Sequence, residues 1–529
     1  MLFTSVEFII FICVIFIAYY LVPKRAQWIL LLAASMLFYY IAGVMGLVYM
    51  GITIFANYFI ALKVSSVRSK KEEYFNANLL NASLKEKKAF KNGMKRDLRV
   101  WLILCILVNV GLLFVLKYMN FAVSGISSLI LGTSDVITFF DIAAPMGISF
   151  YMLSALGYVI DVSRGKHKAE KNPAKFALFV SFFPLVVQGP ILRFEEVSNS
   201  LFAPHTFDKR NVMHGVMRIA WGYVKKLVIA DRMLVAVSAL TGEPEMYQGA
   251  WSLLLVIYYT IEIYADFTGG IDITIGIAQV LGIKLPENFM RPFFSKNIAE
   301  YWRRWHISMG AWFRDYLFYP ISASKTILNI AKKSRKTLGE GFGRRLPVYI
   351  STIVVWLITG LWHGASFNFV MWGILNGVVI IISQELTPLY DRFGKKFPLA
   401  HKNTGYKIMQ AARTVAITAS LRLLDLNTDV GVTFKRFFSI FYTPNYEILT
   451  DGSVFSLGLS VFDYVIIAIG IAAMLIVSLI GRKGSVRDAI CKKGFALPYI
   501  TVAVLCFAVL VFGAYGTGYD ASQFIYNQF

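Results

Sequence analysis

The stretch that decides the fold is LPVYISTIVVWLITGLWHGASFNFVMWGILNGVVIIISQ, residues 346–384, which holds no Asp, Glu, Lys or Arg over 39 positions. At about 1.5 Å of rise per helical residue, this length makes two membrane spans of marginal length. His363 sits close to its middle, between Gly360 and Gly364, and is its one side chain expected to change charge near neutral pH. The pattern predicts two apolar helices that meet near a histidine in a membrane protein.

The composition of the whole chain agrees with that interpretation. Of 529 residues, 57% are hydrophobic and 16% are charged, against about 45–50% and about 25% in soluble domains. This excludes a soluble multidomain enzyme and a disordered chain. Apolar runs lie at about 8–22, 26–46, 47–62, 100–116, 137–160, 176–192, 212–240, 251–282, 346–362, 365–384, 408–424, 459–481 and 495–515.

We therefore expect an all-α polytopic membrane protein with roughly 10–13 transmembrane and re-entrant helices. We expect one integral membrane domain over 1–529, with N-terminal spans in 1–120, a core in 140–385 and further spans and a tail in 400–529. Several turns fall at membrane depth, where irregular backbone is tolerated only against protein or water. The chain is therefore expected to enclose a tunnel.

The charges are strongly asymmetric, with 53 Lys and Arg against 31 Asp and Glu, a net charge of +22. Basic clusters in 63–99 and 325–345 are typical of cytoplasmic loops. This orientation places the N-terminus and the segment near Gly242–Gln248 outside. The chain is too apolar for a nucleic-acid binder, so nucleic acid is not an expected partner.

His363 has two interpretations. An ionisable side chain at membrane depth is a functional candidate, and an imidazole suits proton removal from a hydroxyl at neutral pH. A histidine hydrogen-bonded at a turn between two helices is the alternative. Burial alone does not separate catalysis from structure.

A second polar concentration runs from Trp302 to Tyr316, shortly after Asn288. We expect one amphipathic helix, because Trp302, Trp305 and Met309 share a face at helical spacing. Such a helix can simply lie at the membrane interface, or its arginines can pair with phosphates at a cytoplasmic mouth.

Asp266 and Asp272 lie in apolar sequence and must be paired, hydrated or protonated. For both carboxylates we favour a buried ion pair with a nearby arginine over a direct catalytic role. There is no phosphate-binding glycine loop, no nucleophile elbow and no Cys/His spacing for a metal site, so no metal is expected.

Taken together, these motifs resemble the membrane-bound O-acyltransferases, and among them the bacterial polysaccharide O-acetyltransferases of the alginate and peptidoglycan type. The matching stretches are 145–150, 158–161, 188–190, 225–232, 264–267, 285–289, 302–316 and 361–365. The resemblance implies a ring of helices around a central tunnel. It also implies that His363 is the catalytic histidine and His306 the second histidine of the family.

The resemblance further implies transfer of an acetyl group from cytoplasmic acetyl-CoA to a polysaccharide hydroxyl outside the bacterial plasma membrane. No bound cofactor is expected. An extracytoplasmic acetyltransferase is the expected partner, and the lipid bilayer surrounds the chain. The residues expected to line the substrate path are Arg303, Arg304, Arg314, Asp266, Asn288, Trp305 and Trp362.

The C-terminal sequence FIYNQF, residues 524–529, resembles an ending found in acyl-relay systems of this family. Tyr526 is therefore a candidate for transient acylation. An aromatic anchor at the membrane interface is the alternative.

Two other functions stay open at this point. The first is D-alanyl transfer for teichoic acid modification, with the same histidine and a carrier-protein thioester. The second is a transporter or flippase without enzymatic activity, which would explain broken spans and embedded charges.

Overall fold

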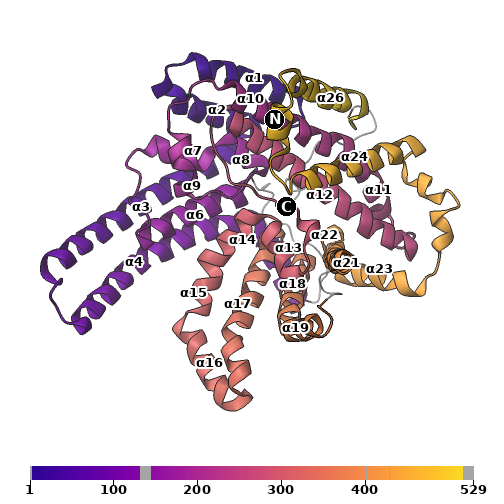
Figure 1. The fold of residues 1–529 in the computed structure, drawn as a ribbon. Coiled ribbons are helices and arrows are strands. Elements are labelled where there is room, and N and C mark those ends of the chain that lie inside the picture. The colour runs from indigo at the N-terminus through magenta and orange to yellow at the C-terminus, as the bar shows by residue number, and fades with distance from the viewer. Residues whose placement is uncertain (1–2, 132–144, 399–402, 428, 516–529) are drawn as a thin grey trace. The chain divides into compact units, whose positions relative to one another are not determined.

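The structure is a computed structural model that describes residues 3–131, 145–398, 403–427 and 429–515 (Figure 1). These residues form helices and no strand, which confirms the prediction of an all-α membrane protein. Within them, seven helices are long and apolar enough to cross a membrane: 24–42, Val44–Asn78, 84–125, Ala250–Val280, Glu340–His363, Phe367–Glu385 and Val461–Ile480.

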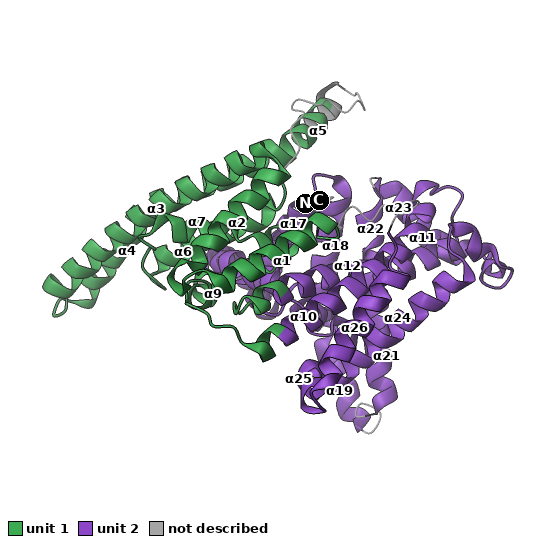
Figure 2. Cartoon of the chain, turned by 90° about the horizontal axis from the view of Figure 1, so that it is seen from above, with its two compact units in different colours: residues 1–212, 277–285 green, residues 213–276, 286–529 purple. Residues whose placement is uncertain are grey.

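The chain divides into two compact units, coloured separately in Figure 2. Unit 1 holds residues 1–212 and 277–285, and unit 2 holds residues 213–276 and 286–529. The helices of unit 1 are α1 (Val6–Leu21), α2 (Gln27–Ala42), α3 (Val44–Asn78), α4 (Leu84–Leu113), α5 (Met119–Leu131), α6 (Ile148–Arg164), α7 (Pro173–Ser181), α8 (Phe183–Gln188) and α9 (Phe194–Leu201).

In unit 1, α3 and α4 pair as a long helical hairpin. The amide groups of Asn57 and Asn109 exchange hydrogen bonds of 2.9 Å between these helices, which satisfies both polar side chains inside apolar sequence. The mixed Lys and Glu residues at 85–88 predict a short surface helix within 63–99, and this prediction is wrong, because no separate helix forms there. Instead α3 continues to Asn78, and Ser83 begins α4 with a capping box to Glu86.

Unit 2 contains most of the embedded charges. Its first helices are α10 (Lys209–Tyr223), the π-helical segment η3 (Val224–Ala230), α11 (Asp231–Gly242) and α12 (Ala250–Val280), of which 209–212 and 277–280 belong to unit 1. Its central helices are α13 (Ile298–Arg304), α14 (Ile307–Phe313), α15 (Tyr319–Ser322), α16 (Lys325–Leu338), α17 (Glu340–His363) and α18 (Phe367–Glu385). The last are α19 (Thr387–Lys396), α21 (Thr404–Leu421), α22 (Leu423–Leu426), α23 (Val430–Tyr442), α24 (Val461–Ile480), α25 (Val486–Lys492) and α26 (Ala496–Phe512).

The uncharged stretch forms the hairpin of α17 and α18, as predicted. The two backbones approach closely at Gly360 and Gly373. A methyl group on Gly360 would collide with the carbonyl oxygen of Phe369 and would lie 3.2 Å from the Cα atom of Gly373. Glycine therefore allows the two helices to approach closely at this point, three residues before His363.

We expect Gly360→Ala to lower the unfolding free energy by about 1–3 kcal/mol, because the added methyl group overpacks a backbone contact. Gly341→Ala is the matched control on the same helix, since a methyl group there has no neighbour within 4 Å. Thermal unfolding of both purified variants in detergent measures the difference. Equal midpoints for the two variants would contradict the assigned contact.

Candidate active site

His363 is the last residue of α17 and is half-buried among aromatic rings. Its ring centroid lies 5.2 Å from that of Trp362, 6.2 Å from that of Phe369 and 4.8 Å from that of Trp372. A side chain on Gly364 would collide with the Phe369 ring. The turn after α17 is therefore built so that the imidazole is held on several sides.

His363 lines a small cavity of unit 2, which we call the His363 cavity. The other lining residues are Ile263, Trp302, Trp305, Met309, Trp372, Arg422 and Asp425. The cavity leaves about 10 Å³ for the centre of a water-sized molecule, which is room for about one water. A larger ligand therefore enters only when neighbouring side chains move.

Arg422 supplies a buried cation to this cavity, with only 4% of its surface exposed. Its guanidinium carbon lies 4.2 Å from the centroid of the Trp305 ring, a cation–π contact. Its Nη2 donates to the Tyr301 hydroxyl at 3.1 Å, and its Nη1 lies 3.5 Å from a carboxylate oxygen of Asp425.

We did not predict Arg422 and Asp425 as site residues. The signal that would have found them is an arginine and an aspartate three positions apart at the end of the apolar run 408–424. Charged side chains next to a membrane span usually serve a function or pair with each other. Their place beside His363 depends on tertiary structure, because about 60 residues separate them along the chain.

The stretch around His306 differs from the predicted continuous helix, and that prediction is wrong. The helix α13 ends at Arg304, and α14 begins at Ile307. His306 adopts a left-handed φ of 47°, which is uncommon for a residue with a side chain. The break directs the backbone so that His306 is fully buried. Such a conformation persists only where the surroundings enforce it.

Asn288 holds this turn in place and is itself fully buried. Its Oδ1 accepts the N–H of Ser308 at 3.0 Å, which identifies this atom as the amide oxygen. The Nδ1 of His306 lies 3.3 Å from the same oxygen and therefore donates its proton to it. In the neutral ring, Nε2 is then the basic nitrogen. Burial lowers the pKa of His306 to about 3, so the ring is neutral at physiological pH.

The Trp362 ring lies near the rings of both His306 and His363. This side chain is buried, and its ring centroid lies 6.2 Å from that of His306 and 5.2 Å from that of His363. Trp305, next to His306 in the sequence, lines the His363 cavity. The structure thus brings together five of the predicted site residues: His363, His306, Asn288, Trp305 and Trp362.

The three predicted arginines lie apart from this cavity. Arg303 and Arg314 are exposed, and Arg314 pairs with Asp315 at 2.9 Å. Arg304 forms an ion pair of 2.5 Å with Glu300 one helical turn away. No residue of this group lines the His363 cavity.

Asp266, on α12, is part of a buried cluster of charged side chains. Lys226 in η3 forms ion pairs of 2.7 Å with Asp266 and 2.8 Å with Asp231, and all three side chains are buried. The ion pair predicted for Asp266 therefore exists with a lysine as its cation, whereas Asp272 has the predicted arginine partner, Arg218. The π-helical turn of η3 places this lysine inside the unit, and such turns are frequent at functional sites.

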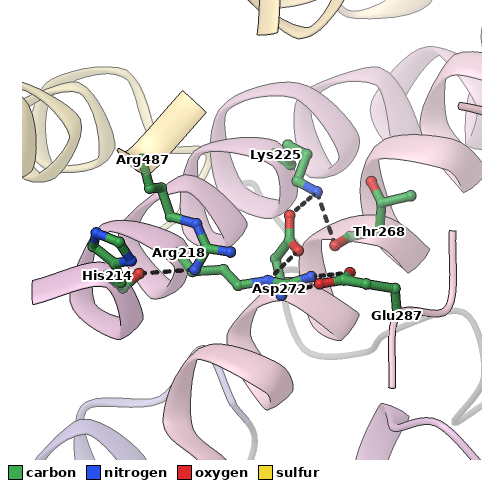
Figure 3. Close-up of polar contacts among 7 residues, drawn as sticks. All are labelled: His214, Arg218, Lys225, Thr268, Asp272, Glu287 and Arg487. Carbon is green, nitrogen blue, oxygen red and sulfur yellow. Dashed lines mark hydrogen bonds and ion pairs between the residues drawn. The ribbon is translucent and has the colours of Figure 1, made fainter. Parts of the chain in front are cut away.

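A second cavity of unit 2, which we call the basic cavity, contains the charge network of Figure 3. Arg218 binds Asp272 at 2.7 Å and both carboxylate oxygens of Glu287 at 2.7 and 2.6 Å. Lys225 binds Asp272 at 2.6 Å and the carbonyl oxygen of Thr268 at 2.8 Å.

Cations exceed carboxylates in the basic cavity. Three cations line it, Arg218, Lys225 and Arg291, against the two carboxylates of Asp272 and Glu287. Arg291 has a left-handed φ of 50°, and its Nη1 has no hydrogen-bond partner among the described residues. The cavity therefore retains a guanidinium group able to bind an anion.

Aromatic rings that line the two cavities pack against one another. Tyr264 and Phe289 line the basic cavity, and Trp305 lines the His363 cavity. The centroid of the Trp305 ring lies 6.1 Å from that of Tyr264 and 5.0 Å from that of Phe289. The linings of the two cavities therefore touch through these aromatic rings.

Two further predictions concern the rest of the chain. Tyr526 lies outside the described residues, so the acyl-relay hypothesis stays a prediction. Among the described ranges, no group of three or more His, Cys, Asp and Glu side chains is arranged to hold a metal ion.

The buried state of His306 predicts a pH dependence of stability. The pKa of histidine in an unfolded chain is about 6.5, whereas burial lowers the pKa of His306 in the folded protein to about 3. The unfolded chain therefore binds more protons between these values, so this contribution to stability is complete above about pH 6.5 and is lost as the pH falls. We expect His306→Gln to lose less thermal stability than wild type between about pH 7.5 and about pH 5. Parallel pH profiles of the two unfolding midpoints would contradict a neutral buried His306.

Comparison with known proteins identifies a family whose model covers both histidines. The model of the membrane-bound O-acyltransferase family matches residues 163–420, which include both His306 and His363. The chain is 33% identical to the probable alginate O-acetylase AlgI of Pseudomonas putida over 391 residues, which covers 73% of this chain and 71% of the relative.

Two other relatives differ in what their names say they modify. The chain is 27% identical to the peptidoglycan O-acetyltransferase of Helicobacter pylori over 426 residues, covering 73% of this chain and 71% of the relative. It is 28% identical to the teichoic acid D-alanyltransferase of Streptococcus thermophilus over 258 residues, covering 48% of this chain and 58% of the relative.

Proposed function

The chain belongs to the membrane-bound O-acyltransferase family, and we propose that it moves an acetyl group from cytoplasmic acetyl-CoA to a polysaccharide hydroxyl outside. It is an O-acyltransferase and a multi-pass membrane protein. In this proposal the membrane is the bacterial plasma membrane, and a partner acetyltransferase outside completes the transfer to the polymer.

One observation above all supports His363 as the general base. It is the one histidine of the uncharged stretch 346–384, and it lines a cavity that also contains the cation of Arg422. In the proposed reaction the acceptor oxygen bonds to the thioester carbonyl carbon while His363 takes the hydroxyl proton. The C–S bond then breaks, and His363 returns the proton to the sulfur of CoA.

His306 has a positioning role in this proposal. It is neutral, and its Nδ1 is directed to Asn288. The Trp362 ring lies 6.2 Å from the His306 ring and 5.2 Å from the His363 ring. A neutral second imidazole leaves the positive charge of the transition state on His363, where the proton arrives.

The basic cavity is the proposed site for the phosphates of the donor. Its excess of cations favours an anion, and Arg291 supplies a free guanidinium nitrogen. With Gly242–Gln248 outside, α12 runs toward the cytoplasm, so Asp272 lies nearer the cytoplasm than Ile263 of the His363 cavity. The nine-residue step between them corresponds to about 13 Å along the helix. A thioester arm that crosses this distance brings its carbonyl to His363.

D-alanyl transfer is the second candidate function, supported by the match to the teichoic acid enzyme. That match covers 48% of this chain, whereas the matches to the alginate and peptidoglycan enzymes each cover 73%. The greater coverage favours acetyl transfer. A donor assay that compares acetyl-CoA with a D-alanyl carrier protein separates the two.

We expect His363→Ala to lower acetyl transfer by at least about 10²-fold, because the hydroxyl loses its proton acceptor. The measurement is radiolabelled acetyl transfer from acetyl-CoA to alginate or peptidoglycan by proteoliposomes that also contain the partner transferase. His167→Ala, which changes a histidine of unit 1 that lines neither cavity, is the control and should keep wild-type activity. Unchanged transfer by folded His363→Ala would reject the base assignment.

Tyr526 allows a separate test of the acyl relay. If Tyr526 carries the acyl group, Tyr526→Phe should abolish transfer to the polymer, because phenylalanine has no hydroxyl to acylate. Mass spectrometry of the C-terminal peptide during turnover should then detect acylated Tyr526 in wild type. Full activity of Tyr526→Phe together with an unmodified peptide would reject the relay.

A further inference from the structure

The His363 cavity contains hydrogen-bond donors that proton transfer by His363 does not use. We propose that Arg422, assisted by the indole N–H groups of Trp302 and Trp372, binds the thioester carbonyl oxygen as negative charge develops on it. This inference rests on the proposed function, since it assigns the group that acts opposite the base in the same reaction.

Arg422 is held in a fixed position while keeping donors available. Its two described hydrogen-bonding contacts use Nη2, toward Tyr301, and Nη1, toward Asp425. A guanidinium group has five N–H donors, so these contacts leave several for a substrate. The cation–π contact with the Trp305 ring further restrains the guanidinium group. A preorganised donor of this kind loses little energy on reorientation when charge develops.

Two tryptophans add neutral donors beside it. Trp302 and Trp372 both line the cavity, and their ring centroids are 5.7 Å apart. Both Nε1 atoms are buried and have no hydrogen-bond partner among the described residues. A buried donor without an acceptor costs free energy, and native structures rarely leave one without a reason. A substrate oxygen in this cavity provides the missing acceptor.

The position of these donors relative to the base fits the reaction. The Trp372 ring lies 4.8 Å from that of His363, and Arg422 lines the same cavity. Asp425 partly balances the charge of Arg422, but the 3.5 Å contact is at the outer limit of a hydrogen bond. The cation therefore keeps attraction for a second anionic oxygen.

With these roles, the acyl-transfer step conserves atoms, protons and electrons. The acceptor oxygen bonds to the carbonyl carbon, the carbonyl π electrons move onto its oxygen, and His363 takes the hydroxyl proton. Arg422 and the two indole groups donate to this oxyanion. When the carbonyl double bond re-forms, the C–S bond breaks and the proton passes from His363 to the sulfur. Nothing is oxidised or reduced.

The test compares Arg422→Gln and Arg422→Lys with wild type in the proteoliposome assay with acetyl-CoA. We expect Arg422→Gln to lower kcat on the order of 10²-fold, the usual effect of losing one oxyanion donor, with little change in KM. Arg422→Lys should recover part of kcat, because it restores the charge without the planar donor array. Trp372→Phe keeps an aromatic ring but loses one N–H, and should lower kcat by about tenfold.

Two substrate analogues separate oxyanion binding from a structural role. S-ethyl-CoA has a methylene in place of the carbonyl, so its inhibition constant should be the same for wild type and Arg422→Gln. With fluoroacetyl-CoA the oxyanion is stabilised by fluorine, so Arg422→Gln should lose less activity than it does with acetyl-CoA. A purely structural defect would lower both activities equally.

Arg436→Gln is the matched control, because Arg436 is also a fully buried arginine of unit 2. It donates to the carbonyl oxygen of Leu240 at 2.8 Å and does not line the His363 cavity. Unfolding midpoints of all variants show which are folded. We expect the folded fraction of Arg436→Gln to keep wild-type kcat and the same activity ratio for the two donors.

The inference is overturned if folded Arg422→Gln and Trp372→Phe keep kcat within about threefold of wild type. It is also overturned if Arg422→Gln loses equal activity with acetyl and fluoroacetyl donors. Both outcomes leave the proposed function intact, provided that wild type transfers acetyl groups and His363→Ala does not. Failure of wild type to use acetyl-CoA would instead reject the proposed function.

Discussion

The contact between the α17 and α18 backbones at Gly360 and Gly373 sets the position of His363. With no side chain at these positions, the helices approach closely enough for the turn between them to be tight. His363 ends α17 at that turn, where Trp362, Phe369 and Trp372 limit its ring on several sides. A general base is useful only when it is held near the atom it deprotonates, so under the proposed function this contact between two helices would serve catalysis as well as stability.

Three groups of charged side chains inside unit 2 differ in how far their charges are balanced. Lys226 has two carboxylate partners, Asp231 and Asp266, so its charge is fully neutralised. The basic cavity has more cations than carboxylates, and the His363 cavity holds Arg422 in a loose pair with Asp425. Removing one partner from a buried ion pair costs about 3–5 kcal/mol, so the neutralised Lys226 group suits a structural role. Incompletely balanced cations are instead suited to an anionic substrate and to a developing oxyanion.

The sequence predicted much of the site, and particular residues show where prediction stops. His363 was predicted because it is an ionisable side chain in an uncharged stretch, and an ionisable group at membrane depth is costly and usually serves a function. His306 was predicted as part of a helix, because helical spacing of Trp302, Trp305 and Met309 is a local signal that contains no information about the bonds of Asn288. The arginines of 303–314 were conspicuous in sequence but are exposed or paired locally.

By itself the sequence determined the membrane environment, the helical class and the identity of the candidate base, because burial of charge in hydrocarbon is costly wherever it occurs along a chain. Only the tertiary structure decided which groups surround that base. Arg422 reaches the His363 cavity from a helix end about 60 positions away, and its orientation depends on stacking against Trp305 and a bond to Tyr301. Such contacts depend on how distant helices pack, and local patterns of polarity do not encode that packing.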